Sequence, residues 1–358
     1  IQYHPTGLPG TGILITEAAR GEGGILVNKE GYRYLQDYDL GMPLDIEDPK
    51  HPVKKSMELG PRDRLSQAFI KEREKEKTIP GPFGDVVHLD IRHLGKKKID
   101  KKLPFVRELT KNYVGIDPVY EPIPVRPVVH YMMGGIDTNI DCSTILPGLF
   151  AAGECACVSI NGANRLGSNS LTEILVYGAR AGQAAAVFAA EHSEINLEAL
   201  EKQGADEYKR ITRDFLQKDG GSERIATLRK EMHQVMEQSV DIFRSESGLK
   251  EACNKIEELK DRFSSILIED KSLNFNTELT SALELENMID VAESIIFSAL
   301  SRRESRGSHQ RTDFVNRDDE NFLRHSLAYR TEAESRIEYQ DVVITKWPPA
   351  ERIYGKEE

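Results

Sequence analysis

Apolar residues recur at spacings of three and four through much of the second half of the chain, beginning near residue 200. This spacing places them along one face of an α-helix. The first series consists of Ile225, Leu228, Met232, Val235, Met236, Ser239 and Phe243. The second consists of Ile256, Leu259 and Phe263, and the third of Leu279, Leu283, Ile289, Ala292 and Ile296. Three successive amphipathic helices predict an antiparallel bundle with the Met residues in its core.

The first half of the chain has a different pattern, in which short apolar runs alternate with Gly and Pro. Two of these runs, Gly12–Thr16 and Val86–Leu89, predict strands. The stretch TILPGLFAAGE, residues 144–154, predicts a buried strand that ends in Gly153 and Glu154. The Ala- and Gly-rich residues 170–191 predict a tightly packed helix. The fold class predicted for the chain is therefore mixed, combining α+β and α/β parts with the helical bundle.

Composition narrows the functional classes. A chain of 358 residues can form two or three domains. Its net charge of -11, with no compensating basic stripe, argues against a nucleic-acid partner. No apolar run approaches the roughly 20 residues of a membrane-spanning helix, so we expect any membrane association to go through a partner. Cys155 and Cys157 lack a zinc-ligand spacing and are interpreted as small buried residues in a reducing compartment.

Two short stretches near the start of the chain carry candidate chemistry. His4 precedes a Pro in extended backbone, where it could cap its own turn or serve as a ligand. In ITEAAR, Thr16 could cap a helix, and Glu17 and Arg20 are spaced to pair at i,i+3. From spacing alone, a structural role explains these residues at least as well as a functional one.

Three further positions add cationic groups. Arg62 follows Pro61 at a predicted helix start, and His130 lies between a β-branched run and a Gly-Gly turn. Arg165 lies among small residues just before a helix, whose N-terminus offers free amides and the positive end of a dipole. Together with the first group, these residues are suited to hold a small dianion.

The order of several longer stretches identifies a family. QYHPTG, ITEAARGEGG, ELGPRD, PVVHYMMGG, GLFAAGE, GANRLGSNSL and ESRGSHQRTDF followed by RDDENFLRH occur in this sequence. This set resembles the flavoprotein subunit of fumarate reductase and succinate dehydrogenase. GYRYLQDY around Tyr32–Tyr38 and GPRD at Gly60–Asp63 are more similar to the fumarate reductase branch.

The resemblance implies a domain order and a cofactor. Residues 1–127 would form a capping domain over the substrate, 128–190 the returning part of an FAD-binding domain, 191–312 a helical domain and 313–358 a small C-terminal domain. Within the last of these, Asp341–Thr345 gives a strand signal. In the family, QYHPTG lies in mid-chain, and this sequence lacks a Gly-rich phosphate turn. We therefore expect a C-terminal fragment whose covalent FAD attachment residue lies in a preceding N-terminal part.

The resemblance also implies the roles of the site residues. One substrate carboxylate would bind Arg165 and His130, and the other would bind His4 and Thr16. Arg62 would deliver the proton to fumarate as hydride arrives from FAD, and Glu17 and Arg20 would return protons to Arg62.

For the cofactor, Glu154 would accept a hydrogen bond from an FAD hydroxyl, and the amides of Ser170 and Leu171 would face the flavin pyrimidine. The implied partners are an iron–sulfur subunit, membrane anchor subunits and, indirectly, the quinone pool, at the cytoplasmic face of the inner membrane. Two alternatives stay open at this point: an L-aspartate oxidase, which shares several motifs, and a non-catalytic truncated chain.

Overall fold

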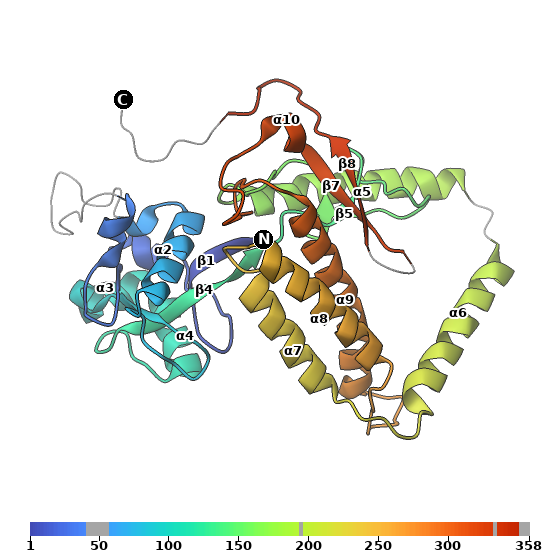
Figure 1. The fold of residues 1–358 in the computed structure, drawn as a ribbon, viewed down its shortest axis with the longest axis horizontal. Coiled ribbons are helices and arrows are strands. Elements are labelled where there is room, and N and C mark those ends of the chain that lie inside the picture. The colour runs from blue at the N-terminus through green and yellow to red at the C-terminus, as the bar shows by residue number, and fades with distance from the viewer. Residues whose placement is uncertain (41–56, 193–195, 332–334, 351–358) are drawn as a thin grey trace. The chain divides into compact units, whose positions relative to one another are not determined.

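The computed structural model describes residues 1–40, 57–192, 196–331 and 335–350. The chain divides into two compact units, and Figure 1 traces both. The first unit comprises Ile1–Met133, Asn161–Leu166 and Ile344–Glu358, and the second comprises Gly134–Ile160 and Gly167–Val343. The division into four domains that the resemblance implies stays a prediction. Within the described ranges, no helix combines the length and the apolar character needed to cross a bilayer.

A four-stranded sheet in the order β1-β4-β3-β2 organises the first unit, with every neighbouring pair antiparallel. Its strands are β1 (Gln2–Gly7), β2 (Ile25–Val27), β3 (Val87–Asp90) and β4 (Ile123–Tyr131). The connecting helices are α1 (Ala18–Gly21), η1 (Tyr34–Tyr38), η2 (Met57–Leu59), α2 (Arg62–Glu74), η3 (Arg92–Leu94), α3 (Gly95–Lys102) and α4 (Pro104–Val114). The strand predicted at Val86–Leu89 is confirmed as β3, whereas Gly12–Thr16 contributes only an isolated bridge between Leu14 and Gly7.

Gly7 is required where β1 meets β4. A Cβ atom at this position would lie 2.2 Å from a methyl carbon of Val128, which is far inside van der Waals contact. The pairing of the two strands is also irregular here, since the register shifts between His4 and Gly7. Only a glycine therefore allows the two backbones to approach this closely.

The second unit is mainly helical. Its helices are α5 (Asn169–Glu191), α6 (Leu197–Ile211), the π-helical turn η4 (Thr212–Leu216), α7 (Ile225–Ser239), α8 (Glu246–Phe263), α9 (Thr277–Ser301) and α10 (Asp319–Phe322). Its strands are β5 (Ile136–Asp137), β6 (Ala156–Cys157), β7 (Arg324–Tyr329) and β8 (Arg336–Asp341). The side chains of Asn196, Ser245 and Asn276 accept the N-terminal amides of α6, α8 and α9, which fixes where these helices begin.

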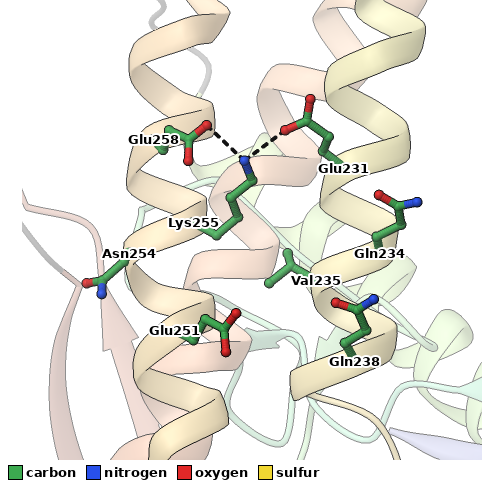
Figure 2. A pocket seen from close by; sticks show the side chains of 8 residues that line it. All are labelled: Glu231, Gln234, Val235, Gln238, Glu251, Asn254, Lys255 and Glu258. Atoms are coloured by element: carbon green, nitrogen blue, oxygen red, sulfur yellow. Dashed lines mark hydrogen bonds and ion pairs between the residues drawn. The ribbon is translucent and has the colours of Figure 1, made fainter.

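A polar groove of about 390 Å³ runs between α7 and α8 (Figure 2). In this groove Lys255 pairs with both Glu231 and Glu258, at 2.8 Å in each case. Hydrogen bonds from Arg262 and then Lys255 lower the pKa of Glu231 to about 2. Three of the charges that line the groove, those of Lys255, Glu231 and Glu258, are thus paired with one another, and the groove contains none of the predicted site residues.

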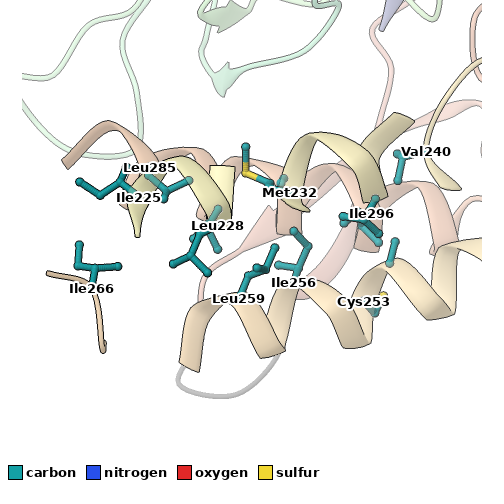
Figure 3. Close-up of a cluster of buried hydrophobic side chains, with 14 of the residues drawn as sticks. Ile225, Leu228, Met232, Val240, Cys253, Ile256, Leu259, Ile266, Leu285 and Ile296 are labelled. Carbon is teal, nitrogen blue, oxygen red and sulfur yellow. The ribbon is translucent and has the colours of Figure 1, made fainter. Parts of the chain in front are cut away.

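The apolar core of the second unit lies between α7, α8 and α9 (Figure 3). Leu228, Ile256, Leu259, Leu285 and Ile296 are fully buried in it. The three predicted helices and the core position of Met232 are thereby confirmed. Phe243 lies beyond the end of α7, because this helix stops at Ser239.

Several local predictions are wrong. Residues 144–154 form turns and a single bridge between Ser143 and Phe150, and the strand β6 comes after Glu154 rather than before it. The predicted C-terminal strand lies earlier, because β8 ends at Asp341. Cys155 is exposed, and Cys157 is half-buried.

The helix predicted at residues 170–191 forms as α5, but it is exposed along most of its length rather than tightly packed. Leu171 and Leu175, for example, are 62% and 74% exposed. Hydrophobic composition alone predicts that such a face is covered, but it cannot tell which part of a protein covers it.

The bundle core gives a direct test. Leu228→Ala should lower the free energy of unfolding by about 2–5 kcal/mol, because it removes buried methyl groups and leaves a cavity. Leu200→Ala is the matched control, since Leu200 on α6 is 54% exposed, and it should change the free energy by less than about 0.5 kcal/mol. Urea unfolding followed by helical circular dichroism measures both values. Equal losses in the two variants would contradict the assigned core.

Candidate active site

Two histidines meet where β1 pairs with β4. Gln2 pairs with Tyr131 and Tyr3 pairs with Val129, so His130 is an extra residue on β4. Such a β-bulge turns a side chain away from its regular direction in the ladder. The rings of His4 and His130 stand edge to face, with their centroids 5.2 Å apart. The irregular pairing therefore brings two residues 126 positions apart into one site.

The surroundings of His4 fix its protonation. Its side chain is buried, and burial, followed by the charges of Arg20 and Arg62, lowers its pKa to about 2. The backbone N–H of Thr6 donates to Nδ1 at 3.3 Å. Because Nδ1 accepts this bond, the single proton of the neutral ring resides on Nε2. His4 therefore offers an N–H donor to a ligand.

Arg62 imposes the same tautomer on His130. Its Nη1 lies 3.1 Å from Nδ1 of His130, and a guanidinium can only donate. Burial, followed by the charges of Arg62 and Arg165, lowers the pKa of His130 to about 4. Its proton is then on Nε2 as well, and the site contains two neutral imidazoles that each offer an N–H.

A single carboxylate oxygen joins Arg62 to Arg20. Oε2 of Glu17 accepts from Nε and Nη2 of Arg62 at 3.0 and 2.9 Å, and from Nη2 of Arg20 at 3.4 Å. The side chain of Glu17 is 48% exposed, whereas that of Arg20 is fully buried. The predicted i,i+3 pair is confirmed, and it continues through Arg62 to His130.

Arg165 is held against the same two strands. Its Nη2 donates to Gln2 at 2.9 Å, and its guanidinium lies over the ring of Tyr131, 4.4 Å from the centroid. Gln2 in turn donates to the carbonyl of Arg165 and to the side chain of Asn164, both at 2.8 Å. Hydrogen bonding and cation–π contact therefore orient the guanidinium before any ligand binds.

Thr16 directly precedes Glu17 in the chain. Its hydroxyl accepts from the amide of Ala18 at 3.4 Å, but the N-cap of the single-turn helix α1 is Glu17, without a side-chain capping hydrogen bond, so the prediction that Thr16 caps the helix is wrong. Thr16 is exposed, and a hydroxyl that accepts one hydrogen bond can still donate its own proton.

The residues predicted to bind the cofactor lie in the second unit. Glu154 is exposed and follows Gly153, which has a left-handed φ of 85°. Ser170 is the second residue of α5, in the turn whose amides precede the helical hydrogen-bond ladder. The amide of Leu171 already donates to the carbonyl of Ser168 at 3.0 Å. Two groups here suit the polar edges of FAD: a carboxylate that can accept from a hydroxyl, and an amide at the start of a helix. Of the two predicted amides, that of Ser170 fits better, because the amide of Leu171 already has an acceptor.

Two family models match the chain: an FAD binding domain over residues 1–171 and a fumarate reductase flavoprotein C-terminal model over residues 229–354. The fumarate reductase flavoprotein subunit of Mycobacterium tuberculosis is 57% identical over 360 residues, which cover 99% of this chain and 61% of that protein. A solved Escherichia coli quinol fumarate reductase FrdA has a TM-score of 0.93 at 52% identity, and the match covers 100% of this chain and 61% of that one.

The chain belongs to the fumarate reductase and succinate dehydrogenase flavoprotein family. The succinate dehydrogenase flavoprotein subunit of Rickettsia bellii is 37% identical, over 99% of this chain and 59% of its own length. The higher identity to the fumarate reductase subunits confirms the branch that the sequence predicts. The chain spans about three fifths of the length of the curated relatives it matches.

The structure thus brings six predicted residues of this family member into one connected cluster in the first unit: His4, Glu17, Arg20, Arg62, His130 and Arg165. Sequence reasoning missed Gln2 and Tyr131, which contact Arg165. It also missed Glu58, whose backbone carbonyl accepts a hydrogen bond from Arg20. Gln2 could have been found, because it precedes His4 by two residues and so shares its face of a strand.

The buried imidazole makes stability depend on pH. His4 takes up a proton in the unfolded chain below about pH 6.5 but remains neutral in the folded chain until about pH 2. Its contribution is therefore complete above pH 6.5 and is lost as the pH falls, by up to about 1.4 kcal/mol per pH unit. His4→Gln should flatten the decline in unfolding free energy between about pH 6.5 and 4.5, measured by urea unfolding. Parallel declines in the two proteins would show that His4 is not held neutral.

Proposed function

We propose that this chain, in the FAD-loaded enzyme, reduces fumarate to succinate and carries out the reverse oxidation. The observation that carries the proposal is the charge of the cluster. Arg20 and Arg62 share one carboxylate oxygen of Glu17, Arg165 adds a third guanidinium to the cluster, and both imidazoles are neutral. Guanidinium forks and neutral N–H donors both bind carboxylate oxygens, which suits the two carboxylates of fumarate.

The two carboxylates would bind at different groups. Arg165 presents a planar fork that suits a carboxylate, and His130, whose pKa the nearby charge of Arg165 lowers, would donate its Nε2–H to the same carboxylate. The Nε2–H of His4 and the hydroxyl of Thr16 bind the second carboxylate. Because these donors are fixed before substrate arrives, they stabilise negative charge that develops on a carboxylate during the reaction.

The reaction adds one hydride and one proton across the double bond of fumarate. FAD, when bound, supplies the hydride. Arg62 gives the proton to the neighbouring carbon and recovers one through Glu17, whose side chain reaches solvent. Arg20 holds Glu17 in place. These two roles, proton return to Arg62 and positioning by Arg20, account for the contact of one Glu17 oxygen with both arginines.

The proposed cofactor residues are Glu154, Ser170 and, with its amide shared with Ser168, Leu171. The proposed partners are an iron–sulfur subunit that delivers electrons, membrane anchor subunits and the quinone pool, with the subunit peripheral at the cytoplasmic face of the inner membrane. The designation of the solved relative as a quinol fumarate reductase supports the quinone pool among these partners.

Two substitutions separate proton delivery from substrate binding. Arg62→Lys should lower kcat by about 10²- to 10⁴-fold with a nearly unchanged KM for fumarate, because general acid catalysis acts in the transition state. Arg165→Lys should mainly raise KM, since Lys keeps the charge but loses the fork. Both are assayed in the FAD-loaded enzyme with reduced viologen as electron donor.

The same assay tests the assignment as a whole. A flavin-containing enzyme that does not turn over fumarate but oxidises L-aspartate would favour the oxidase alternative, which the relatives' names do not support. If Arg62→Lys raises KM and spares kcat, Arg62 is a binding residue and the proton has another source.

A further inference from the structure

A second ion pair, between Arg33 and Glu58, lies next to Arg20 and has no part in the proposed reaction. The carboxylate of Glu58 is completely buried. Arg33 grips it with two parallel hydrogen bonds, Nε to Oε1 at 2.8 Å and Nη2 to Oε2 at 2.6 Å. The amide of Leu26 in β2 also donates to Oε1, at 3.2 Å. A buried carboxylate with three such donors is a rigid anchor, and one that is costly to disturb.

The backbone of the same residue holds Arg20. The carbonyl oxygen of Glu58 accepts a hydrogen bond from Nη1 of Arg20. Nε of Arg20 is buried and has no hydrogen-bond partner among the described residues. The guanidinium is therefore located by two described hydrogen bonds, one to Glu17 and one to Glu58.

The position of Arg62 also depends on Glu58 through the chain. Glu58 lies in η2, and the amide of Gly60 closes a turn onto the carbonyl of Met57 at 3.0 Å. A Cβ on Gly60 would lie only 3.0 Å from that carbonyl oxygen, so the turn is tight. Pro61 follows, and Arg62 is the first residue of α2. Fixing Glu58 thus fixes the start of the helix that carries Arg62.

We propose that Glu58 is the positioning residue of the proton relay, holding Arg20 through its carbonyl and the start of α2 through its buried carboxylate. The inference rests on the proposed function, in which Arg62 delivers the proton. Glu58 touches neither substrate nor cofactor in this role; it acts through the two arginines. Its pair with Arg33 also keeps a negative charge beside Arg20 in a site that is otherwise rich in cations.

The charge on Glu58 affects the pKa of Arg20. The charged and titratable groups around Arg20 are Glu17 on α1, Arg62 on α2, Glu58 on η2, Tyr34 on η1 and His4 on β1. Burial lowers the pKa of Arg20 to about 10, while the charges of Glu17 and Glu58 oppose the decrease. Loss of the charge on Glu58 therefore favours the deprotonated form of Arg20 and shifts the alkaline limb of activity to lower pH.

The test compares Glu58→Gln with Glu72→Gln in the FAD-loaded enzyme. Glu72 is a matched control because it is also a buried acid of the first unit, bound by Asn28 at 2.9 Å and Tyr38 at 2.6 Å, away from the relay. Glu58→Gln should lower kcat by about 10- to 100-fold, the effect of displacing a catalytic group by roughly 1 Å. KM for fumarate should change less than about twofold, and the alkaline limb of the kcat profile should move to lower pH. Glu72→Gln should leave the profile unchanged.

Two further measurements keep the outcome decisive. Arg33→Lys retains the charge of the pair but loses the fork, so it should lower kcat without moving the alkaline limb. Hydrogen exchange should accelerate at residues 57–65 in Glu58→Gln and not in Glu72→Gln. An unchanged kcat profile together with unchanged exchange would overturn the role of Glu58. If the wild-type enzyme does not turn over fumarate, the proposed function fails, and the exchange comparison alone decides whether Glu58 anchors the segment.

Discussion

The proposed active site depends on keeping positively charged groups close together around the carboxylate of Glu17. Arg20 and Arg62 share one oxygen of Glu17, and Arg165 adds a third guanidinium, which Gln2 and the ring of Tyr131 orient. Two guanidinium groups this close repel each other, and burial weakens their hydration. The protein tolerates this arrangement because both neighbouring imidazoles stay neutral. A dianionic ligand would add negative charge to this cluster of guanidinium groups. The electrostatic cost of holding the groups together would then be recovered when a dicarboxylate binds.

The backbone that produces this arrangement is irregular at each critical position. The bulge at His130 turns its ring towards His4, and Gly7 permits close approach of the two strands. Gln2 ties the segment around Arg165 to β1, although the two are 163 residues apart in sequence. Regular strands would direct these side chains according to the pleat, whereas a convergent site requires them to depart from it. The buried carboxylate of Glu58 is held by Arg33, and the backbone carbonyl of the same residue binds Arg20.

Local periodicity predicted the parts of the fold whose cores are local. The helices α7, α8 and α9 pack on one another, so the apolar face of each is visible in its own sequence. The prediction failed at residues 144–154, where apolar residues lie in turns, and on α5, whose apolar face is exposed. Motif resemblance supplied the site residues, but not Glu58 or Gln2. Their roles arise from contacts across 25 or more residues, and neither burial of a charge nor a β-bulge has a signature in the local sequence.

The charge balance of the site is tested most directly by calorimetry on the oxidised, FAD-loaded enzyme, which binds fumarate without turnover. Fumarate and its monomethyl ester differ by one charge at nearly constant shape. The account predicts that the ester binds about 10- to 100-fold more weakly, as expected for loss of a hydrogen-bonded charged group. It also predicts that fumarate binding near neutral pH takes up almost no protons, because both imidazoles bind the carboxylates as neutral Nε2–H donors. Equal affinities, or a binding heat that differs between buffers of different protonation enthalpy, would contradict the account.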